Sequence, residues 1–524
     1  MNKKIRDPRA LSRRSFISTS ASLAAATMLG SKAVAAAGSE TGSLFSLGVA
    51  SGDPASDGFV LWTRLARHPG EPAGGMPPEP IQTTWQVASD EAMTRIVREG
   101  TAVADPAWAH SVHIEVDRLQ PDRWYWYRFQ TRNETSPIGR TRTLPSADMR
   151  TERLSFAFAS CQKYEMGYYT AYEHMGREDL DLVVFLGDYI YEKDDSSSAV
   201  RPHGLAAVKT LEDYRMRYGV YKSDASLQKA HAMAPWIVTW DDHEVGNDYA
   251  GAVPEDPENL TTADFLRRRA AAYQAYYEHM PLRRSARPSG PDLRLYRRLD
   301  YGRLARFHVL DTRQYRTDQP GETRRQPPSS SLEDPERTML GSAQREWLAD
   351  GLDRSPATWN VIAQQVLMAK VDIEPGPSVI VDVDKWAGYE HERRWLLRHL
   401  RDRRISNPVI LTGDIHSNWA NELNDGFDSS EPRSVAVEFV GTSISSGGHG
   451  VDQPDELATL LAQNPAVKFH NDERGYVRCE VTPESWRTDF RTVSYIDRPG
   501  APLNTRASFE IEAGNSRLRS LKAG

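Results

Sequence analysis

The sequence is poor in cysteine, and beyond its first 37 residues it has no long hydrophobic run. Its 524 residues include only two cysteines, Cys161 and Cys479, which excludes a small fold built on disulfide bonds. No stretch after residue 37 holds the roughly 20 consecutive apolar residues that a transmembrane helix needs. We therefore expect no stable membrane span in the mature chain, which is long enough for two domains.

Basic residues are outnumbered by acidic ones. The chain has 65 basic and 72 acidic residues, and residues 1–37 hold seven of the basic residues but only one of the acidic ones. The remainder therefore has a net charge of −13. Because binding to a phosphate backbone needs a basic face, this balance excludes nucleic acid as the main partner. If the substrate is anionic, bound cations must supply the local attraction, so the charge balance points to metals.

The first 37 residues have the pattern of a twin-arginine signal peptide. Arg13 and Arg14 follow a basic start, and a mildly apolar run rich in Ala, Ser and Thr ends in small residues at positions 33–37. A membrane anchor is the alternative, but the run is short and is interrupted by Lys32 and several hydroxyl residues. We therefore expect export by the twin-arginine translocation machinery and a periplasmic or secreted protein. That machinery carries folded proteins, which suits a metal bound before export.

The remaining chain divides near residue 145. Before that point, short runs of strand-favouring residues alternate with turns, at residues 58–65, 83–88, 111–116 and 124–130. Strands of this kind over about 100 residues are typical of a sandwich. The sequence therefore predicts an all-β, fibronectin type III-like sandwich domain over residues 44–145.

Helices and strands alternate in the second part. Amphipathic runs predict helices, and apolar runs predict strands; the helices are 261–277, 342–352 and 389–403, and the strands include 304–310, 359–368 and 434–440. Alternation of this kind favours layered α/β structure with the catalytic loops on one edge. We therefore expect an α/β catalytic domain over residues 150–510.

Three apolar strands run directly into polar residues of similar kinds. The pairs of strand and following segment are 181–186 (DLVVFL) with 187–192 (GDYIYE), 236–240 (WIVTW) with 241–244 (DDHE), and 409–412 (VILT) with 413–416 (GDIH). Open α/β sheets place their chemistry at the carboxyl ends of the strands. Strands that end in Asp, His or Tyr therefore predict a metal-dependent hydrolase.

The residue types suggest a ferric centre. Asp188 ends a strand and can bridge two cations through its two oxygens. Tyr191 has a reference pKa near 10, so binding as a phenolate takes a strongly Lewis-acidic ion, for which ferric iron is the usual choice. Cys161 ends another apolar strand, residues 154–161, and its thiolate would suit the same ion. A buried, inert thiol is an equally good interpretation of Cys161 from its position alone.

The other polar groups suggest a second, different ion. His416 can give a neutral imidazole to one metal while Asp414, two residues earlier, faces the other. Asp242, Asp414 and Asn247 offer hard oxygen atoms, which suit Ca²⁺ or Mg²⁺. The mixed set of donors predicts a mixed-metal site and not a pair of zinc ions.

His243 lies inside the acidic cluster 241–244. A histidine held beside a metal-bound phosphate could stabilise charge or protonate the leaving oxygen. A structural histidine that is hydrogen-bonded at a strand end is the alternative. We favour a catalytic role, because a core seldom holds so many ionisable groups without a function.

These motifs together resemble the PhoD-like alkaline phosphatases. The segments that carry the resemblance are 160–162 (SCQ), 187–192 (GDYIYE), 240–244 (WDDHE) and 413–416 (GDIH), with support from 310–316, 359–368 and 384–389. The resemblance extends over nearly the whole mature chain. It implies a calcineurin-like metallophosphoesterase sandwich, Fe³⁺ and Ca²⁺ as cofactors, and hydrolysis of phosphomonoesters and phosphodiesters. Members of the family are typically exported by the twin-arginine route.

Two positions depart from the wider calcineurin-like pattern. Asp242 stands where dinuclear relatives usually have Asn, and residues 361–365 (VIAQQ) lack the histidine of a Val-x-x-His motif. Loss of that histidine removes a nitrogen donor from the second metal, and an oxygen-rich site fits Ca²⁺ better than zinc. We expect one or two Ca²⁺ ions, with Asn247 as a further ligand.

The expected reaction follows from this ligand set. Fe³⁺ would be held by Cys161, Asp188, Tyr191 and His416, and Ca²⁺ by Asp188, Asp242 and Asp414. A metal-bound oxide or hydroxide would attack phosphorus in line, with Asp188 and His243 as the catalytic residues.

Two other functions remain open from sequence. The first is an iron-dependent phosphodiesterase of phospholipase D type, because such an enzyme also belongs to the group that the chain resembles. The second is an exported binding protein without activity, in which the metals only brace the fold; the density of motifs argues against it.

Overall fold

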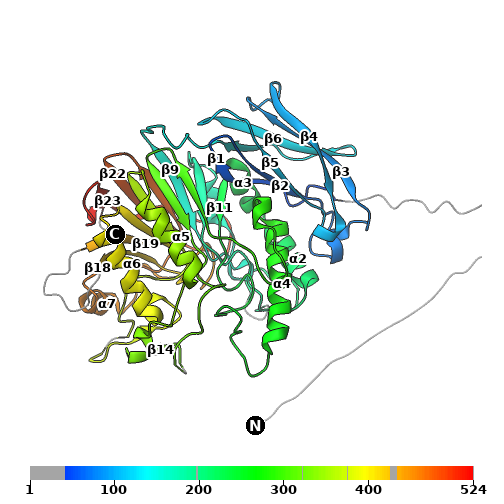
Figure 1. The fold of residues 1–524 in the computed structure, drawn as a ribbon. Coiled ribbons are helices and arrows are strands. Elements are labelled where there is room, and N and C mark those ends of the chain that lie inside the picture. The colour runs from blue at the N-terminus through cyan, green and yellow to red at the C-terminus, as the bar shows by residue number, and fades with distance from the viewer. Residues whose placement is uncertain (1–41, 196–198, 322, 375, 425–433, 523–524) are drawn as a thin grey trace, which may run out of the picture. The chain divides into compact units, whose positions relative to one another are not determined.

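The computed structural model describes residues 42–195, 199–321, 323–374, 376–424 and 434–522 (Figure 1). The predicted signal peptide, residues 1–37, lies outside these ranges. None of the helices in them combines the length and the hydrophobicity that a bilayer span requires. The part from residue 42 onward forms one compact unit in which two large sheets are paired.

The first sheet has ten strands and a parallel centre. Its order is β24-β23-β22-β21-β9-β10-β11-β1-β2-β5, and β9, β10, β11 and β1 run parallel. The central strands are β9 (Leu154–Ala159), β10 (Leu182–Phe185), β11 (Trp236–Val238) and β1 (Val49–Ala55). On one side follow β21 (Arg474–Val481), β22 (Ser485–Val493), β23 (Leu503–Glu512) and β24 (Arg519–Lys522). On the other side follow β2 (Gly58–Arg64) and β5 (Ser111–Val116).

The second sheet has seven strands in the order β12-β13-β15-β17-β19-β18-β20. Its parallel centre is formed by β13 (Ala305–Val309), β15 (Trp359–Ala363), β17 (Pro408–Thr412) and β19 (Ser434–Val440). Antiparallel strands complete it, namely β12 (Arg297–Tyr301), β18 (Asn418–Asn424) and β20 (Val467–Asn471).

Alternation along the central strands explains why the two sheets pair. In β9, Phe156 and Phe158 belong to the hydrophobic cluster between the sheets, while Ala157 and Ala159 face the opposite side. Because successive side chains of a strand point to opposite faces, an entirely apolar strand must be covered on both faces. One face of the first sheet therefore packs on the second sheet, and the other face needs helices.

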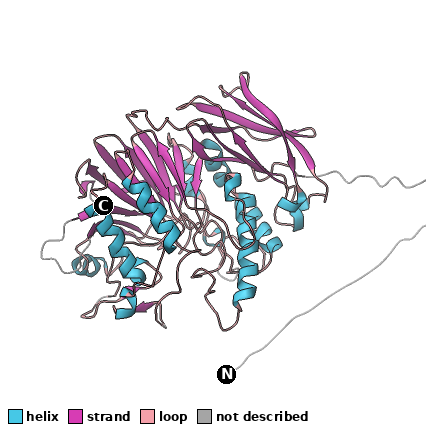
Figure 2. Ribbon diagram, in the orientation of Figure 1, coloured by secondary structure: helices cyan, strands magenta, loops and turns pink. Residues whose placement is uncertain are grey.

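Helices cover the outer faces of both sheets (Figure 2). The first sheet is covered by α1 (Thr170–Met175), α2 (Leu211–Lys222), α3 (Ala225–Met233) and α4 (Thr262–His279). The second is covered by α5 (Gly341–Asp353) and α6 (Glu390–Asp402), with the short α7 (Leu457–Gln463) near β20. The described residues thus form four layers: helices, sheet, sheet and helices.

Local sequence sets the boundaries of these helices. The Thr210 side chain accepts a hydrogen bond from the Asp213 amide, and the Asp213 carboxylate accepts one from the Thr210 amide, so α2 begins with a capping box. Thr261 caps α4 in the same way, through the amide of Asp264. In α6, Leu396, Leu397 and Leu400 recur at helical spacing and are buried against the second sheet.

The N-terminal strands form a sandwich of their own. A five-stranded sheet of β3 (Ile81–Ala88), β4 (Ile96–Ala104), β6 (Trp124–Thr131), β7 (Glu134–Thr135) and β8 (Gly139–Arg142) packs on β1, β2 and β5. The strands β1, β2 and β5 also extend the first large sheet, because β1 pairs in parallel with β11 at Gly52 and Trp236. Gly52 is required there, since a Cβ would lie 2.5 Å from the Pro281 carbonyl oxygen.

Most of the predicted elements are confirmed. The predicted helices 261–277, 342–352 and 389–403 correspond to α4, α5 and α6 within two residues at each end. The predicted strand 359–368 is too long, because β15 ends at Ala363. Beyond it, two backbone hydrogen bonds still link the chain to the end of β17, from the Gln364 amide to the Leu411 carbonyl and from the Gly413 amide to the Gln365 carbonyl. The Gln364 side chain donates to the Val366 carbonyl and to Thr412. The helices α2 and α3 were not predicted.

Both cysteines are buried and neither forms a disulfide. Cys479 lies in β21, with its sulfur 3.7 Å from the hydroxyl of Thr488, and Cys161 follows the end of β9. Cys479 is thus part of the apolar layer between the sheets, far along the strand from the loops that follow β9 and β10.

We expect Cys479→Ser to lower the free energy of unfolding by about 1–2 kcal/mol, because it places a hydroxyl in an apolar layer. Urea unfolding measures this loss, and the metal content of the purified protein should not change. Titration of the denatured, metal-free protein without reductant should detect both thiols. Absence of free thiols in that titration would contradict the arrangement described here.

Candidate metal centre

The carboxyl ends of four parallel strands meet at one edge of the paired sheets. The loop after β9 bonds to the loop after β10, since the Cys161 amide donates to the Gly187 carbonyl at 3.0 Å. The same loop bonds to the segment after β19, where Ser160 and Ser443 form a parallel bridge. Segments that are far apart in sequence are therefore brought together at one place, as the strand-end pattern predicts.

The backbone is strained at this edge. Cys161, Asp188, Asp414 and His416 all have positive φ, at 58°, 57°, 67° and 56°. The left-handed region is costly for residues with a Cβ, and such residues cluster at functional sites where the surrounding structure holds them. Four of the residues predicted as ligands share this uncommon conformation.

The first group of donors contains a thiol, a carboxylate and an imidazole. Ligand atoms of Cys161, Asp188 and His416 all lie within 4.8 Å of one another. The phenol oxygen of Tyr191 joins them, 2.9 Å from Asp188 Oδ2 and 3.1 Å from His416 Nε2. It also accepts a hydrogen bond of 2.8 Å from Ser446. The four residues predicted to hold iron are thus neighbours in space.

A second group shares Asp188. Ligand atoms of Asp188, Asp242 and His243 also lie within 4.8 Å of one another. The Oδ1 atom of Asp188 is buried and has no hydrogen-bond partner. A buried carboxylate oxygen without a donor is costly, so this atom is suited to face a cation. Asp188 is the residue common to both groups.

Burial governs the protonation of the first group. It raises the pKa of Cys161, of Tyr191 and of Asp188 well above their ordinary values. It lowers the pKa of His416 to about 3, so this imidazole is neutral and can donate its lone pair. A cation at this place would favour the ionised forms of the three acidic groups.

His243 is held by a carboxylate. Its Nδ1 atom lies 2.7 Å from Glu192 Oε2, and its ring lies 4.2 Å from the ring of Tyr191, centroid to centroid. Burial alone would lower the pKa of His243, but the Glu192 carboxylate outweighs burial and raises it well above its ordinary value. The reverse holds for Glu192, where burial is outweighed by the imidazolium and the pKa falls to about 2. The pair fixes the orientation of the ring.

Cations neutralise the acidic residues on the other side of the site. The Lys385 ammonium contacts the carboxylate of Asp414. Arg313 forms two bonds of 2.9 and 3.0 Å with Asp384 and another with Asp241. Its guanidinium nitrogens also lie 3.6 Å from Asp242 and 3.9 Å from Asp414. Asp414 therefore belongs to neither donor group and instead pairs with buried cations.

Asn247, another predicted ligand, has its side chain hydrogen-bonded outside the two donor groups. Its side-chain amide donates a hydrogen bond of 2.6 Å to Glu255, and its backbone amide donates one of 3.0 Å to Glu192. The side-chain nitrogen thus points to a partner outside the donor groups. Of the residues predicted as ligands, the structure gathers Cys161, Asp188, Tyr191, Asp242 and His416.

The comparisons with known proteins agree with this geometry. Residues 31–145 match the family described as "PhoD-like phosphatase, N-terminal domain", and residues 156–490 match the "PhoD-like phosphatase" family. The chain belongs to the PhoD-like phosphatases. It is 49% identical over 484 residues to the protein "Alkaline phosphatase D" of Bacillus subtilis (strain 168), covering 91% of this chain and 82% of that protein.

A solved structure supports the same assignment. The chain matches "Structure of PhoD" with a TM-score of 0.89 and 49% sequence identity, over 92% of this chain and 93% of that one. The family resemblance seen in the sequence is therefore confirmed, and the protein is a PhoD-type phosphoesterase, a phosphoric ester hydrolase. PhoD-type phosphatases depend on metals, and the two donor groups are where this chain could bind them.

Four residues around the PhoD-like site were not predicted as functional: Glu192, Arg313, Lys385 and Ser446. Glu192, Arg313 and Lys385 lie in segments that the sequence singled out. Glu192 ends the segment 187–192, Arg313 and Lys385 lie in segments that support the family resemblance, and Ser446 lies in a serine- and glycine-rich loop. Their contacts cross long stretches of sequence, so no local pattern identifies their partners.

Gly187 sets the turn that delivers Asp188. Its φ is +109°, and a Cβ at this position would lie 2.4 Å from the backbone nitrogen of Asp241. The loops after β10 and β11 are therefore in contact through a residue that has no room for a side chain. Glu244 reinforces this contact, because its carboxylate accepts hydrogen bonds from the amides of Asp188, Tyr189 and Asp241.

We expect Gly187→Ala to lower the free energy of unfolding by about 2–4 kcal/mol, since it adds a steric clash to a strained φ. Gly204→Ala is a matched control, because Gly204 also has a positive φ of +71° but no atom within 4 Å of its Cβ position. The control should cost only about 1 kcal/mol. Urea unfolding of both variants compares them, and equal losses would show that the contact with Asp241 is unimportant.

Proposed function

We propose that this phosphoesterase holds Fe³⁺ at the first donor group and Ca²⁺ beside it, at Asp188 and Asp242 of the second group together with Asp414, and that it hydrolyses both phosphomonoesters and phosphodiesters. The observation that carries the proposal is the position of Asp188, which is shared by both groups and has a buried oxygen without a partner. A carboxylate in such a position is suited to bridge two cations.

The chemistry of the donors supports this pair of ions. Cys161, Asp188, Tyr191 and His416 would hold Fe³⁺, because a phenolate and a thiolate suit a strongly Lewis-acidic ion. Asp188, Asp242 and Asp414 would hold Ca²⁺, with Asn247 as a further oxygen ligand and with room for one or two ions. Asp414 could bind the ion only if the Lys385 ammonium moved away from its carboxylate. Asn247 would bind the ion through its side-chain oxygen, because its side-chain nitrogen donates to Glu255.

When bound, the ions would supply positive charge for the phosphate ester and an activated water for attack on phosphorus. The residues of the chain have separate tasks around them. Asp188 would hold the two ions at a fixed spacing. His243, oriented by Glu192, would stabilise charge on the ester or give a proton to the leaving oxygen. Arg313 lies 3.6 Å from Asp242 and lowers the pKa of this carboxyl, and the Lys385 ammonium pairs with Asp414.

We propose that the layers described above are those of a calcineurin-like metallophosphoesterase sandwich over residues 150–510. The N-terminal strands over residues 44–145 would form a fibronectin type III-like sandwich. A separate hydrophobic cluster from residues 44–129 supports this division. The pairing of β1 with β11 would join the two domains through one continuous sheet.

We also propose that residues 1–37 direct export by the twin-arginine machinery, and that the enzyme acts in the periplasm or outside the cell. The support is the pair Arg13 and Arg14 followed by a short, mildly apolar run. The substrates would then be small phosphate esters outside the cytoplasm.

Tyr191→Phe tests the ligand assignment. Loss of the phenol oxygen should lower iron affinity and turnover of p-nitrophenyl phosphate at least about 100-fold. Tyr189→Phe is the matched control, because Tyr189 is buried in the same segment but its hydroxyl bonds to His231, 2.7 Å away and outside both donor groups. Elemental analysis should find iron in the control and little in Tyr191→Phe.

Asp188→Asn should remove both ions and reduce the hydrolysis of p-nitrophenyl phosphate and of its bis-ester together. Near wild-type turnover with unchanged metal content in this variant or in Tyr191→Phe would rule out the proposed centre. Hydrolysis of only one ester by the wild-type enzyme would restrict the proposed substrate range to that class.

Glu192→Gln tests the task of His243. The variant keeps the shape of the side chain but removes the charge that holds the imidazole, so kcat should fall about 10- to 100-fold. Iron and calcium content should stay at wild-type levels, because neither Glu192 nor His243 is among the proposed ligands of the two ions. An unchanged kcat would mean that the orientation of His243 does not matter for the reaction.

A further inference from the structure

A strongly basic segment lies outside the metal centre. Residues 283–298, which follow α4 and include the first two residues of β12, contain six arginines and only one aspartate, in a chain with a net charge of −7. Such a concentration of positive charge on an acidic protein can attract anions locally. None of these residues belongs to the two donor groups.

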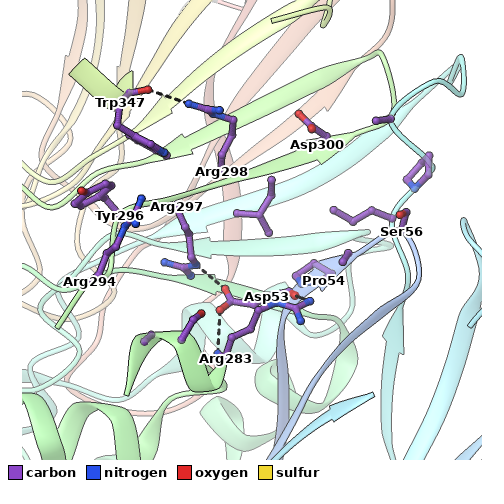
Figure 3. A pocket seen from close by; sticks show the side chains of 17 residues that line it. Asp53, Pro54, Ser56, Arg283, Arg294, Tyr296, Arg297, Arg298, Asp300 and Trp347 are labelled. Atoms are coloured by element: carbon purple, nitrogen blue, oxygen red, sulfur yellow. Dashed lines mark hydrogen bonds and ion pairs between the residues drawn. The ribbon is translucent and has the colours of Figure 1, made fainter. Parts of the chain in front are cut away.

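Four of the six arginines line a cavity of about 560 Å³ (Figure 3). The cavity lies where β12 and α5 face the end of β1, and its walls come from five separate stretches of the chain, within 53–56, 144–147, 283–286, 294–300 and at 347. Its lining includes Asp53 from β1, Ser56 just after that strand and Trp347 from α5. The volume is within the range of about 300–1,000 Å³ that is usual for small-molecule sites.

Two of these arginines are neutralised within the protein. Arg297 Nε lies 2.7 Å from Asp53 Oδ1, and Arg283 donates a hydrogen bond of 2.8 Å to the Asp53 carbonyl and lies 3.5 Å from Glu115. Figure 3 shows Arg283 and Arg297 turned toward Asp53. The other carboxylate of the lining, Asp300, accepts two hydrogen bonds, of 2.5 and 3.1 Å, from Arg306, which lies outside the cavity.

The other two arginines have no carboxylate partner. The Arg298 guanidinium lies 4.8 Å from the centroid of the Trp347 ring and donates a hydrogen bond of 2.9 Å to its carbonyl, while its Nε is buried without a partner. The Arg294 guanidinium lies 4.8 Å over the ring of Tyr296. Within the described ranges, neither residue forms an ion pair. A guanidinium stays protonated in proteins, so both charges persist.

We propose that this cavity is a second anion site, in which Arg294 and Arg298 bind a phosphate-type oxyanion. The planar guanidinium presents paired donors that match phosphate oxygens, and the aromatic rings beneath both groups hold them in place. The anion is either free phosphate, which the enzyme releases, or a phosphate group of a larger ester. The cavity has room for the organic part of such an ester, because phosphate alone fills a small fraction of it.

The cavity does not include the residues of the two donor groups, but it is hydrogen-bonded to segments that lead to them. Arg297 donates a hydrogen bond of 2.9 Å to the carbonyl of Val238, the last residue of β11. Leu293 exchanges hydrogen bonds with Gln314, the residue after Arg313. An anion in the cavity would therefore bind beside the segments that lead to Asp241 and Arg313.

Equilibrium dialysis of the metal-loaded enzyme with radiolabelled inorganic phosphate tests the proposal. The wild-type enzyme should bind one phosphate more per chain than Arg294→Gln/Arg298→Gln, or bind it about tenfold more tightly. Arg517→Gln is the control, because Arg517 is exposed, has no ion pair among the described residues and lies outside the cavity. Its binding should equal that of the wild type. Turnover of p-nitrophenyl phosphate should be similar in all three proteins, so a failure of the metal centre is detected separately.

A second variant protects the test against a folding defect. Arg294 is exposed, so Arg294→Glu should leave the unfolding midpoint unchanged and still weaken the extra site, because it places a negative charge beside Arg298. Arg298→Lys keeps the charge and should retain part of the affinity. Equal binding of inorganic phosphate by the wild type, the double variant and Arg294→Glu would overturn the proposal, unless dimethyl phosphate binds in a way that depends on these arginines.

The same dialysis with dimethyl phosphate in place of inorganic phosphate distinguishes the two sources of the anion. If the arginine-dependent site takes inorganic phosphate, its ligand is the free ion. If it takes only dimethyl phosphate, its ligand is the phosphate group of an ester. If neither anion binds in a way that depends on Arg294 and Arg298, the cavity is not an anion site.

Discussion

Asp188 is a carboxylate buried at the edge of the paired sheets. The surrounding loops hold it there although its burial and its backbone conformation are both unfavourable in free energy. Its backbone has a positive φ of 57°, its Oδ1 has no partner, and burial raises its pKa. Gly187 and the Glu244 carboxylate fix the turn that presents it. Taking a carboxylate out of water costs several kcal/mol unless a charge or donors offset it. A bound cation would offset this cost, which makes the strained turn consistent with metal binding.

The charges around Asp188 are arranged differently on its two sides. On the side of Cys161 and His416, the neighbouring groups carry no charge. The Cys161 thiol becomes a ligand only when it loses its proton, and the His416 imidazole is already neutral. Toward Asp242, by contrast, the Arg313 guanidinium and its partner Asp384 form a fully buried network. That network satisfies its own charges within the protein. Asp188, between the two donor groups, has instead the His243 imidazolium as its positive neighbour.

Much of the fold and the main part of the site follow from the sequence. Strands such as residues 154–161 are apolar on both faces, which requires layers on both sides, and the structure has them. Parallel strands place their carboxyl ends together, so polar residues after three such strands had to become neighbours. This reasoning correctly brought Cys161, Asp188 and His416 together. Strand ends were predicted less sharply, since β15 ends at Ala363, five residues before the predicted end at Met368.

The sequence by itself determined the layered α/β class, the family and the residues at the strand ends, because periodicity and short motifs are local properties. Only the tertiary structure decided which charges are paired. Arg313 meets Asp241 across 72 positions of sequence, and Arg297 meets Asp53 across 244. The same holds for the two arginines left without a carboxylate in the cavity beside β12. An ion pair depends on distance and burial in space, and neither quantity is encoded in the neighbouring residues of the chain.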